Sequence, residues 1–181
     1  MSKIGRKPIF LGDVSVQLNG QIISYKSKKA SGTYELPASI KPSIDGQYLK
    51  LDIPNEARNS DNNRIWGLHR ALVANAIKGA DVGFTKQLQI IGLGFKAALT
   101  GNKMVFNIGY THKIEMPLPM DVTLEVDKTG QLLTFKSSDR RQLGEICDKV
   151  RSLRVPEPYK GTGIKYSTEV IVRKAGKTKA S

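Results

Sequence analysis

One pattern of strands followed by a helix occurs twice along the chain, and this repeat is the strongest constraint on the fold. Two segments of the first half are echoed in the second half: Tyr34-Glu35-Leu36-Pro37 by Ile114-Glu115-Met116-Pro117, and Gly46-Gln47-Tyr48-Leu49 by Gly130-Gln131-Leu132-Leu133. A helical pattern follows the second segment of each pair. Repeats of this kind indicate one supersecondary unit that is used twice.

The repeat predicts an α+β fold of two similar small domains, residues 1–82 and residues 83–181 of the 181-residue chain. We expect each domain to be an antiparallel β-sheet with a helix packed on one face. The second domain would also carry a basic C-terminal tail. The predicted junction lies near Ala80 to Phe84.

Alternating apolar residues locate the strands of the first domain. Val14 to Leu18 has the period of a half-buried strand. Asn19-Gly20 predicts a hairpin turn, because both residues tolerate positive φ, and Gln21 to Tyr25 then forms the partner strand. A later strand is expected over Tyr48 to Ile53.

Each domain has one predicted helix. The first has three consecutive good N-caps at its start, Asn59, Ser60 and Asp61, and is expected to end at Gly79. Helical spacing predicts an apolar stripe of Ile65, Leu68, Leu72 and Ala76. Three further residues widen this apolar face: Trp66, Val73 and Ile77. The second helix begins at Ser138 or Asp139, and its matching stripe is Leu143, Ile146 and Val150.

The chain is strongly cationic, with 29 Lys and Arg against 16 Asp and Glu, a net charge of +13 and a pI near 9.9. Such a surplus points to nucleic acid or an anionic membrane as partner. No run of about 18 apolar residues predicts a membrane span. The N-terminal residues lack the apolar region of a secretory signal, and the single cysteine excludes an internal disulfide. We therefore expect a cytosolic, soluble protein.

The stretch Pro156-Glu157-Pro158-Tyr159-Lys160-Gly161-Thr162-Gly163-Ile164 predicts a stiff exposed loop. Its prolines fix φ and remove backbone donors, so no helix runs through it. Its glycines let the backbone turn tightly or lie close to a partner. Backbone N–H groups, one aromatic ring and one ammonium group together suit a phosphate-rich surface.

Positive charge is concentrated from Arg151 onward, where only Glu157 and Glu169 oppose a run of Lys and Arg. Tyr166 to Val172 could add a last strand, since its apolar residues alternate. The final residues, 174–181, are too polar and small to pack. We expect them to be disordered alone and to order on an anionic partner.

Gly109-Tyr110-Thr111-His112-Lys113 leaves a strand at a glycine and places an aromatic ring, a hydroxyl, an imidazole and an ammonium in five residues. One interpretation is an ordinary polar hairpin loop. The other is an RNA-facing loop, because irregular RNA is recognised by stacking, hydrogen bonding and charge. The pattern leaves both open.

Gly92 to Ala97 fits the dinucleotide fingerprint G-x-G-x-x-G/A, but that motif must open a helix and strand-like residues follow here. We expect a glycine-loosened bend in a sheet and no cofactor. His69 and His112 lie in different repeats, and Cys147 is predicted to be a buried small hydrophobe. The spacing supports no catalytic constellation and no metal site.

Taken together, these stretches resemble the L-six family of bacterial-type large-subunit ribosomal proteins. The resemblance rests on the start Ser2 to Ile9, the Gly109 to His112 loop, the Pro156 to Ile164 stretch and the basic tail, and it covers nearly the whole chain. The nine-residue stretch is the specific motif. The family usually has Lys at the position of Thr162 and Ser-His-Pro in place of Thr111-His112-Lys113.

The resemblance implies a structural protein that binds large-subunit rRNA near the sarcin–ricin loop and the stalk base. It would support subunit assembly and the region where translation factors bind. The implied partners are large-subunit rRNA and neighbouring ribosomal proteins of the stalk base, with translation GTPases nearby. The implied place is the cytoplasmic ribosome of a bacterium, or less readily an organelle. No enzymatic activity, cofactor, membrane or small-molecule substrate is implied.

We expect the rRNA contacts to come from the second domain. The candidate residues are Arg151, Arg154, Tyr159, Lys160, Gly161, Thr162, Gly163, Lys165, Arg173, Lys174, Lys177, Lys179, Tyr110, Thr111, His112 and Lys113. The cations would neutralise phosphates, and Tyr159 would stack on RNA or brace the loop, unless its ring simply packs on the sheet edge. Two alternative functions remain: a nucleotide-binding enzyme that uses Gly92 to Ala97, and a DNA architectural protein.

Overall fold

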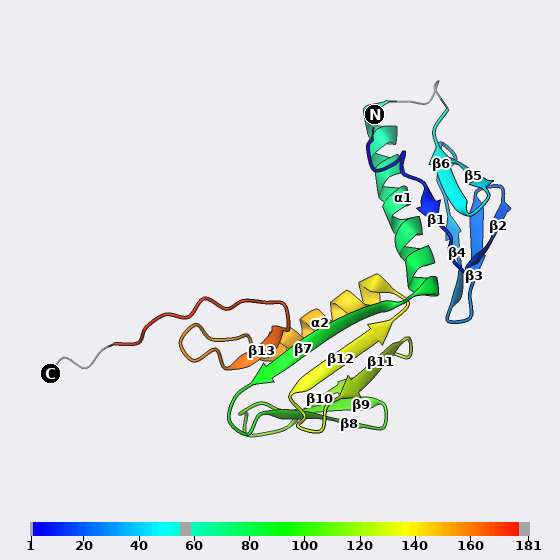
Figure 1. Cartoon of the computed structure of the whole chain (residues 1–181). Coiled ribbons are helices and arrows are strands. Elements are labelled where there is room, and N and C mark those ends of the chain that lie inside the picture. The colour runs from blue at the N-terminus through cyan, green and yellow to red at the C-terminus, as the bar shows by residue number, and fades with distance from the viewer. Residues whose placement is uncertain (1, 55–58, 178–181) are drawn as a thin grey trace. The chain divides into compact units, whose positions relative to one another are not determined.

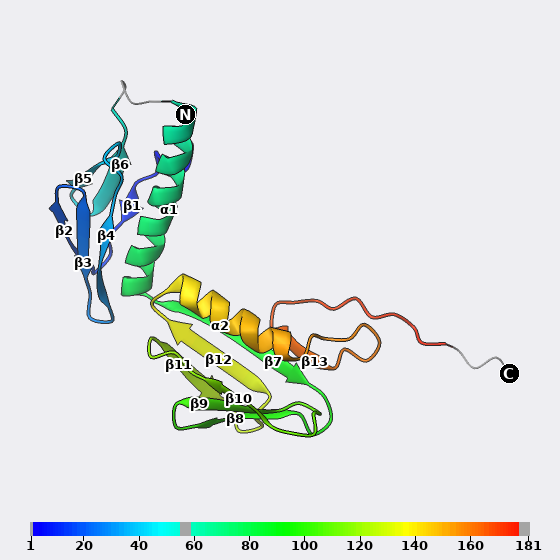
Figure 2. The ribbon, with the colours of Figure 1, turned by 180° about the vertical axis from the view of Figure 1, so that it is seen from behind.

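The computed structural model describes residues 2–54 and 59–177, and the chain divides into two compact units (Figures 1 and 2). One unit is Met1–Gly83 with Ser138–Arg140, and the other is Phe84–Ser137 with Arg141–Ser181. In the described part of the chain, no helix combines the length and apolarity that a membrane crossing needs.

The first unit contains two three-stranded antiparallel sheets and one helix. Its strands are β1 (Ile9–Phe10), β2 (Ser15–Asn19), β3 (Ile22–Lys26), β4 (Ser31–Glu35), β5 (Lys41–Asp45) and β6 (Tyr48–Asp52). They form the sheets β1-β6-β5 and β2-β3-β4, and helix α1 (Ser60–Asp81) follows β6. The strand expected over Tyr48 to Ile53 is confirmed, and its residues Leu49, Leu51 and Ile53 are buried.

The second unit repeats this order and adds one strand. Its strands are β7 (Phe84–Ile91), β8 (Lys96–Thr100), β9 (Lys103–Asn107), β10 (Ile114–Pro117), β11 (Val122–Val126), β12 (Leu132–Ser137) and β13 (Gly163–Tyr166). They form the sheets β11-β12-β7-β13 and β10-β9-β8, and helix α2 (Arg140–Leu153) follows β12. The predicted α+β class with antiparallel sheets is confirmed. The shared strand order is what an internal duplication predicts.

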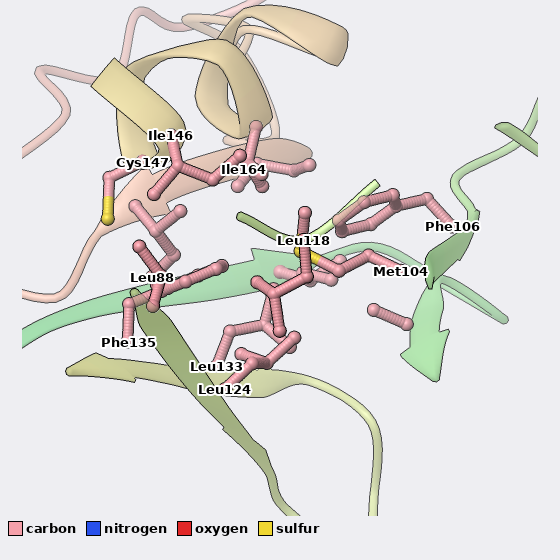
Figure 3. Packing of buried hydrophobic residues seen from close by; sticks show 14 of the residues in the cluster. Leu88, Met104, Phe106, Leu118, Leu124, Leu133, Phe135, Ile146, Cys147 and Ile164 are labelled. Carbon is pink, nitrogen blue, oxygen red and sulfur yellow. The ribbon is translucent and has the colours of Figure 1, made fainter. Parts of the chain in front are cut away.

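One face of the four-stranded sheet carries the core of the second unit (Figure 3). Buried residues alternate along β7 and β12, with Leu88 and Ile90 on the first and Leu133 and Phe135 on the second. β9 adds Met104 and Phe106. Helix α2 adds the predicted stripe and the expected buried cysteine: Leu143, Ile146, Cys147 and Val150. Burial raises the pKa of the Cys147 thiol to about 11, which makes it a packing group rather than a nucleophile.

The predicted apolar face of α1 is confirmed only in part, because two residues of its central stripe do not face the core. Leu68 is 56% exposed and Leu72 is 41% exposed, whereas Trp66, Val73 and Ile77 are buried. The indole determines which face turns inward, because Trp66 Nε1 donates to the carbonyl of Leu51 at 2.8 Å. A large ring with a buried donor needs such an acceptor, and helical spacing alone did not reveal it.

The ends of α1 also differ in part from expectation. Asn59, one of the three predicted caps, is the N-cap of α1. Its side chain accepts a hydrogen bond from the backbone N–H of Asn62 at 2.7 Å. The helix does not end at Gly79, which is buried within it. It ends at Asp81, where the Lys78 carbonyl accepts from the N–H groups of Val82 and Gly83.

One predicted turn is placed differently in the structure, and one glycine-rich segment has the conformation that was expected. Asn19 pairs with Ile22, so the two-residue loop of the first hairpin is Gly20-Gln21 and not Asn19-Gly20. The Gly92 to Ala97 segment closes a turn, in which the Phe95 N–H donates to the Gly92 carbonyl at 3.3 Å, and leads into β8. The helix that a dinucleotide-binding loop requires is therefore replaced by a strand, as expected.

Candidate nucleic-acid interface

The loop from Pro156 to Ile164 connects α2 to β13 and is held by several hydrogen bonds. The Ile164 N–H donates to the Arg154 carbonyl at 2.8 Å, and the Glu157 N–H donates to the Thr162 carbonyl at 3.1 Å. The Thr162 hydroxyl donates to Glu157 Oε1 at 2.9 Å. Thr162 therefore braces the loop from within, and its hydroxyl is already engaged.

Gly163 is the position in this loop that admits no side chain. Its φ is +143°, and a Cβ there would lie 2.7 Å from Pro156 Cα and 2.8 Å from the Val155 carbonyl oxygen. Both atoms belong to the backbone, which cannot move aside without disturbing the loop. Glycine is required because the two ends of the loop touch.

The last strand lies earlier than predicted. β13 covers Gly163 to Tyr166 and pairs with β7, with Ile164 opposite Ile90, whereas the sequence favoured Tyr166 to Val172. The chain turns directly after Tyr166, because the Glu169 N–H donates to the Tyr166 carbonyl at 3.0 Å. Val170 and Val172 are consequently 88% and 80% exposed.

The described part of the tail returns to the loop after this turn. The Lys174 N–H donates to the Pro158 carbonyl at 2.8 Å, and a Cβ on Gly161 would lie 3.3 Å from Arg173 Nε. Residues 175–177 then lead away from the unit (Figure 1). We call the exposed side chains of this loop and of the described tail the loop–tail surface: Tyr159, Lys160, Arg173, Lys174 and Lys177. Lys179 lies outside the described residues.

Tyr159 is exposed on the loop–tail surface. Its side chain is 57% exposed, and among the described residues its hydroxyl has no hydrogen-bond partner. The alternative in which the ring packs on the sheet edge with a capping hydroxyl is not what the structure shows. Its ring is available for stacking.

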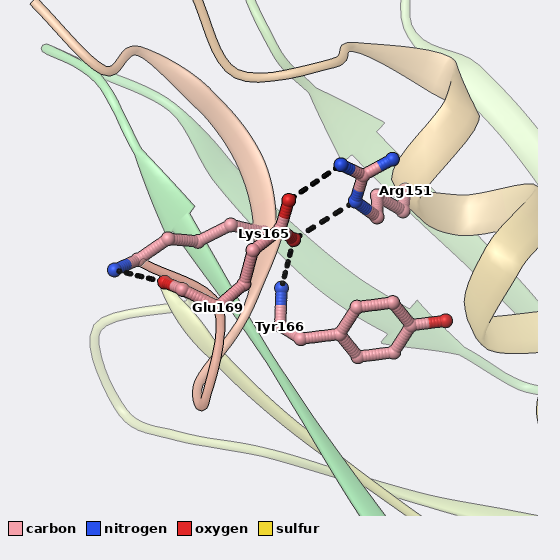
Figure 4. A network of polar contacts seen from close by, with 4 residues as sticks. All are labelled: Arg151, Lys165, Tyr166 and Glu169. Carbon is pink, nitrogen blue, oxygen red and sulfur yellow. Dashed lines mark hydrogen bonds and ion pairs between the residues drawn. The ribbon is translucent and has the colours of Figure 1, made fainter. Parts of the chain in front are cut away.

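Arg151 and Lys165 are committed to internal contacts (Figure 4). Arg151 donates through Nε and Nη2 to the Glu169 carboxylate at 2.9 and 2.5 Å, and Lys165 Nζ donates to the Glu169 carbonyl at 3.3 Å. Hydrogen bonding from Arg151 holds the pKa of Glu169 below its ordinary value, and the same contact raises the pKa of Arg151. This pair fastens α2 to the turn after β13 and neutralises its own charge.

Arg154 joins the second candidate loop to the end of α2. Its Nη1 donates to the Ile108 carbonyl at 2.6 Å, and its guanidinium lies 4.8 Å from the centre of the Phe95 ring and 5.5 Å from that of Tyr110. The Tyr110 hydroxyl donates to the Leu153 carbonyl at 3.0 Å. Sequence reasoning missed Phe95, whose ring lies within contact distance of both Gly92 and Gly109.

The loop 109–113 is therefore anchored at one end and open along its length. Tyr110, Thr111, His112 and Lys113 are all exposed, and the rings of Tyr110 and His112 are nearly parallel, with centres 6.5 Å apart. The structure places this loop in the same unit as the loop–tail surface, with Arg154 between the end of α2 and the loop.

The second histidine, His69, makes an internal contact in the first unit. His69 Nδ1 shares a 2.7 Å hydrogen bond with the Tyr34 hydroxyl, and burial lowers the pKa of this histidine. Within residues 2–54 and 59–177, no three His, Cys, Asp or Glu side chains are grouped as a metal site would need.

Comparison with known proteins identifies the family. The family model for ribosomal protein L6 matches residues 91–167, which include the 109–113 loop, α2 and β13. The chain is 38% identical to the large ribosomal subunit protein uL6 of Paramagnetospirillum magneticum over 180 residues, covering 99% of this chain and 100% of the relative. It is 39% identical to that of Carboxydothermus hydrogenoformans over 179 residues, covering 98% and 97%.

These relatives match the chain along nearly its whole length, so both units are included in the relationship. The family is a structural, non-enzymatic one, which removes the enzyme alternative. The chain belongs to the ribosomal protein L6 (uL6) family.

Proposed function

We propose that this chain is a structural constituent of the large ribosomal subunit and binds large-subunit rRNA through its second unit. The observation that carries the proposal is the loop–tail surface, where four exposed cations and one exposed aromatic ring lie on the loop and on the tail that the Lys174–Pro158 hydrogen bond joins to it. Cations there would neutralise phosphates, and Tyr159 would stack on an unpaired base.

The place of binding on the rRNA is the finer part of the proposal. The family resemblance favours the neighbourhood of the sarcin–ricin loop and the stalk base, next to ribosomal proteins of the stalk base and close to where translation GTPases act. The protein would support assembly and the factor-binding region of a bacterial ribosome in the cytoplasm. No step of this role requires a cofactor or a reacting side chain.

Seven of the candidate cations fall into two groups in this proposal. Lys160, Arg173, Lys174 and Lys177 are exposed and fit phosphate contact. Arg151, Lys165 and Arg154 are engaged with Glu169, Phe95 and backbone carbonyls, so we assign them to holding the surface in shape. Gly161 and Gly163 are buried in the loop and set its backbone path rather than offering an open approach.

Co-sedimentation tests the proposal at the level of the subunit. The purified chain should co-sediment with large ribosomal subunits lacking uL6 through a high-salt gradient. Excess duplex DNA should displace little of the bound chain. Equal affinity for duplex DNA and for deproteinised large-subunit rRNA at matched salt would instead favour the DNA architectural alternative. Absence from the subunit fraction would contradict the ribosomal role.

A further inference from the structure

The loop 109–113, between β9 and β10, is supported by a stack of side chains built into the second unit. Phe95 lies at its base, and a Cβ on Gly92 or on Gly109 would lie 2.4 or 2.7 Å from atoms of the Phe95 ring. The absence of a side chain at these two glycines therefore leaves the space that the Phe95 ring occupies. The Arg154 guanidinium lies over the ring at 4.8 Å, in the range of a cation–π contact.

Arg154 and Tyr110 then fix the loop against the end of α2. One nitrogen of Arg154 donates to the Ile108 carbonyl directly before the loop, and its guanidinium lies 5.5 Å from the Tyr110 ring. The Tyr110 hydroxyl donates to the Leu153 carbonyl at 3.0 Å. A tyrosine held at its hydroxyl and along its ring has little freedom left to lose when it binds a ligand.

The exposed end of this arrangement is a pair of nearly parallel rings. Tyr110 is 45% exposed, His112 is exposed, and their planes differ by 23° at a centre-to-centre distance of 6.5 Å. That distance is at the far end of the range for rings in contact, so the two rings gain little from each other. Both rings are therefore exposed aromatic surfaces on which a base can stack.

We infer that Tyr110 and His112 form a stacking site for one unpaired RNA base, with Lys113 beside it for the adjoining phosphate. Arg154 is a positioning residue of this site and does not itself contact the RNA. The inference rests on the proposed function and deepens it, because it names a base-stacking contact separate from the phosphate contacts of the loop–tail surface. RNA rather than duplex DNA is the ligand, since its loops and bulges offer unstacked bases.

Stacking and charge contacts have different signatures, which makes the site testable. Loss of a phosphate contact reduces the slope of log affinity against log salt, whereas loss of a neutral stacking contact lowers affinity at every salt concentration. The probe is deproteinised bacterial large-subunit rRNA in a filter-binding titration over salt, at one fixed, mildly alkaline pH for all variants. His112→Ala, His112→Phe and the matched control Met120→Ala, at a side chain 96% exposed in the same unit, are compared.

We expect His112→Ala to weaken binding on the order of tenfold with an unchanged salt slope. His112→Phe should restore the affinity, because it keeps the ring and removes only the nitrogens. Met120→Ala should bind as the wild type does. Wild-type affinity in His112→Ala, or a Phe variant as weak as the Ala variant, would overturn the stacking site.

Chemical probing of the rRNA distinguishes two ways in which an Arg154 substitution could weaken binding: loss of the positioned loop 109–113 and general damage to the fold. One unpaired base that dimethyl sulfate modifies in the free rRNA should be protected when the wild-type protein is bound. It should remain modified when His112→Ala is bound. Arg154→Lys keeps the charge but loses the planar stack, so it should lose protection of that same base while keeping protections made by the loop–tail surface. Retained protection of that base in Arg154→Lys would overturn the positioning role. If wild-type protein fails to bind the rRNA at all, the proposed function itself has failed.

Discussion

The two units share a strand order and differ at one sheet edge. In the first, the edge strand β1 has two residues and, among the described strands, pairs with β6 alone. In the second, the corresponding strand β7 has eight residues and pairs on its outer side with β13. The added strand brings with it the Pro156 to Ile164 loop and the basic tail. An extra strand at one edge thus gives the second unit a cationic surface without altering the shared framework.

The helices of the two units differ in a related way. Helix α2 buries a stripe at regular spacing and ends at Leu153, whose carbonyl receives the Tyr110 hydroxyl. Helix α1 is longer and is oriented by Trp66, with Leu68 and Leu72 left exposed. The end of α2 is therefore part of the candidate interface, whereas α1 packs through its indole into its own unit.

Removing the indole from α1 should have the largest effect on stability. Trp66→Ala should cost about 3–5 kcal/mol, because it leaves a cavity and an unpaired Leu51 carbonyl. Denaturant unfolding followed by circular dichroism measures this loss. Leu68→Ala, at the exposed position of the same helix, should stay within about 0.5 kcal/mol. An equal cost for both variants would contradict the observed orientation of α1.

Gly163→Ala should give the next largest effect, confined to the second unit. Backbone strain and the clash with Pro156 should together cost about 2–3 kcal/mol and lower rRNA affinity. Gly101→Ala is the matched control, since its φ is +59° and nothing lies within 4 Å of its Cβ. That variant should cost about 1 kcal/mol. If both cost the same, the close approach of the loop ends is not what selects glycine at position 163.

The Arg151–Glu169 pair should make stability of the second unit depend on acid. The folded pKa of Glu169 lies below its ordinary value of 4.5, so the carboxylate stabilises the fold above that pH. This contribution is lost as the pH falls through the lowered folded pKa. Glu169→Gln should cost about 1 kcal/mol at pH 7 and flatten the acid dependence. Unchanged dependence in that variant would assign the acid sensitivity to other carboxylates.

Thr162→Lys should have the smallest effect on stability, and its effect on RNA contact can be measured from the salt slope of rRNA binding. The ammonium can pair with Glu157 in place of the hydroxyl, so unfolding should change by less than about 0.5 kcal/mol. An ammonium that reaches a phosphate should steepen the salt slope by about 0.7 to 0.9. An unaltered slope would show that position 162 faces Glu157 and not the RNA.

Periodicity predicted the second unit better than the first. The stripe Leu143, Ile146 and Val150 and the buried Cys147 are as expected, because local pattern and burial agree there. The orientation of α1 depends on a long-range contact from Trp66 to Leu51, which no local pattern contains. The position of β13 depends on the turn closed by Glu169, whose carboxylate also holds Arg151.

The sequence named the residues of the candidate site, but it did not separate the exposed ones from those engaged in internal contacts. The sequence predicted that the Pro156 to Ile164 loop and the basic tail face RNA, and it left two interpretations open for the 109–113 loop. Among the described candidates, Gly161 and Gly163 are buried, and the exposed ones are Tyr110, Thr111, His112, Lys113, Tyr159, Lys160, Arg173, Lys174 and Lys177. Counting charge could not show that Arg151 is paired with Glu169 or that Arg154 lies over Phe95. Such pairings join residues 18 or more positions apart, so only the folded structure separates cations that can contact phosphate from those that hold the surface together.

The salt dependence of rRNA binding tests the central claim most directly. The wild type is compared with a variant that combines Lys160→Glu with a chain ending at Val172, which removes Arg173, Lys174, Lys177 and Lys179. The control is Lys28→Glu, an exposed lysine of the first unit. If the loop–tail surface neutralises phosphates, the salt slope of the combined variant should fall by about 3 to 4 while the control keeps the wild-type slope. An unchanged slope and affinity in the combined variant would contradict the assignment of rRNA binding to this surface.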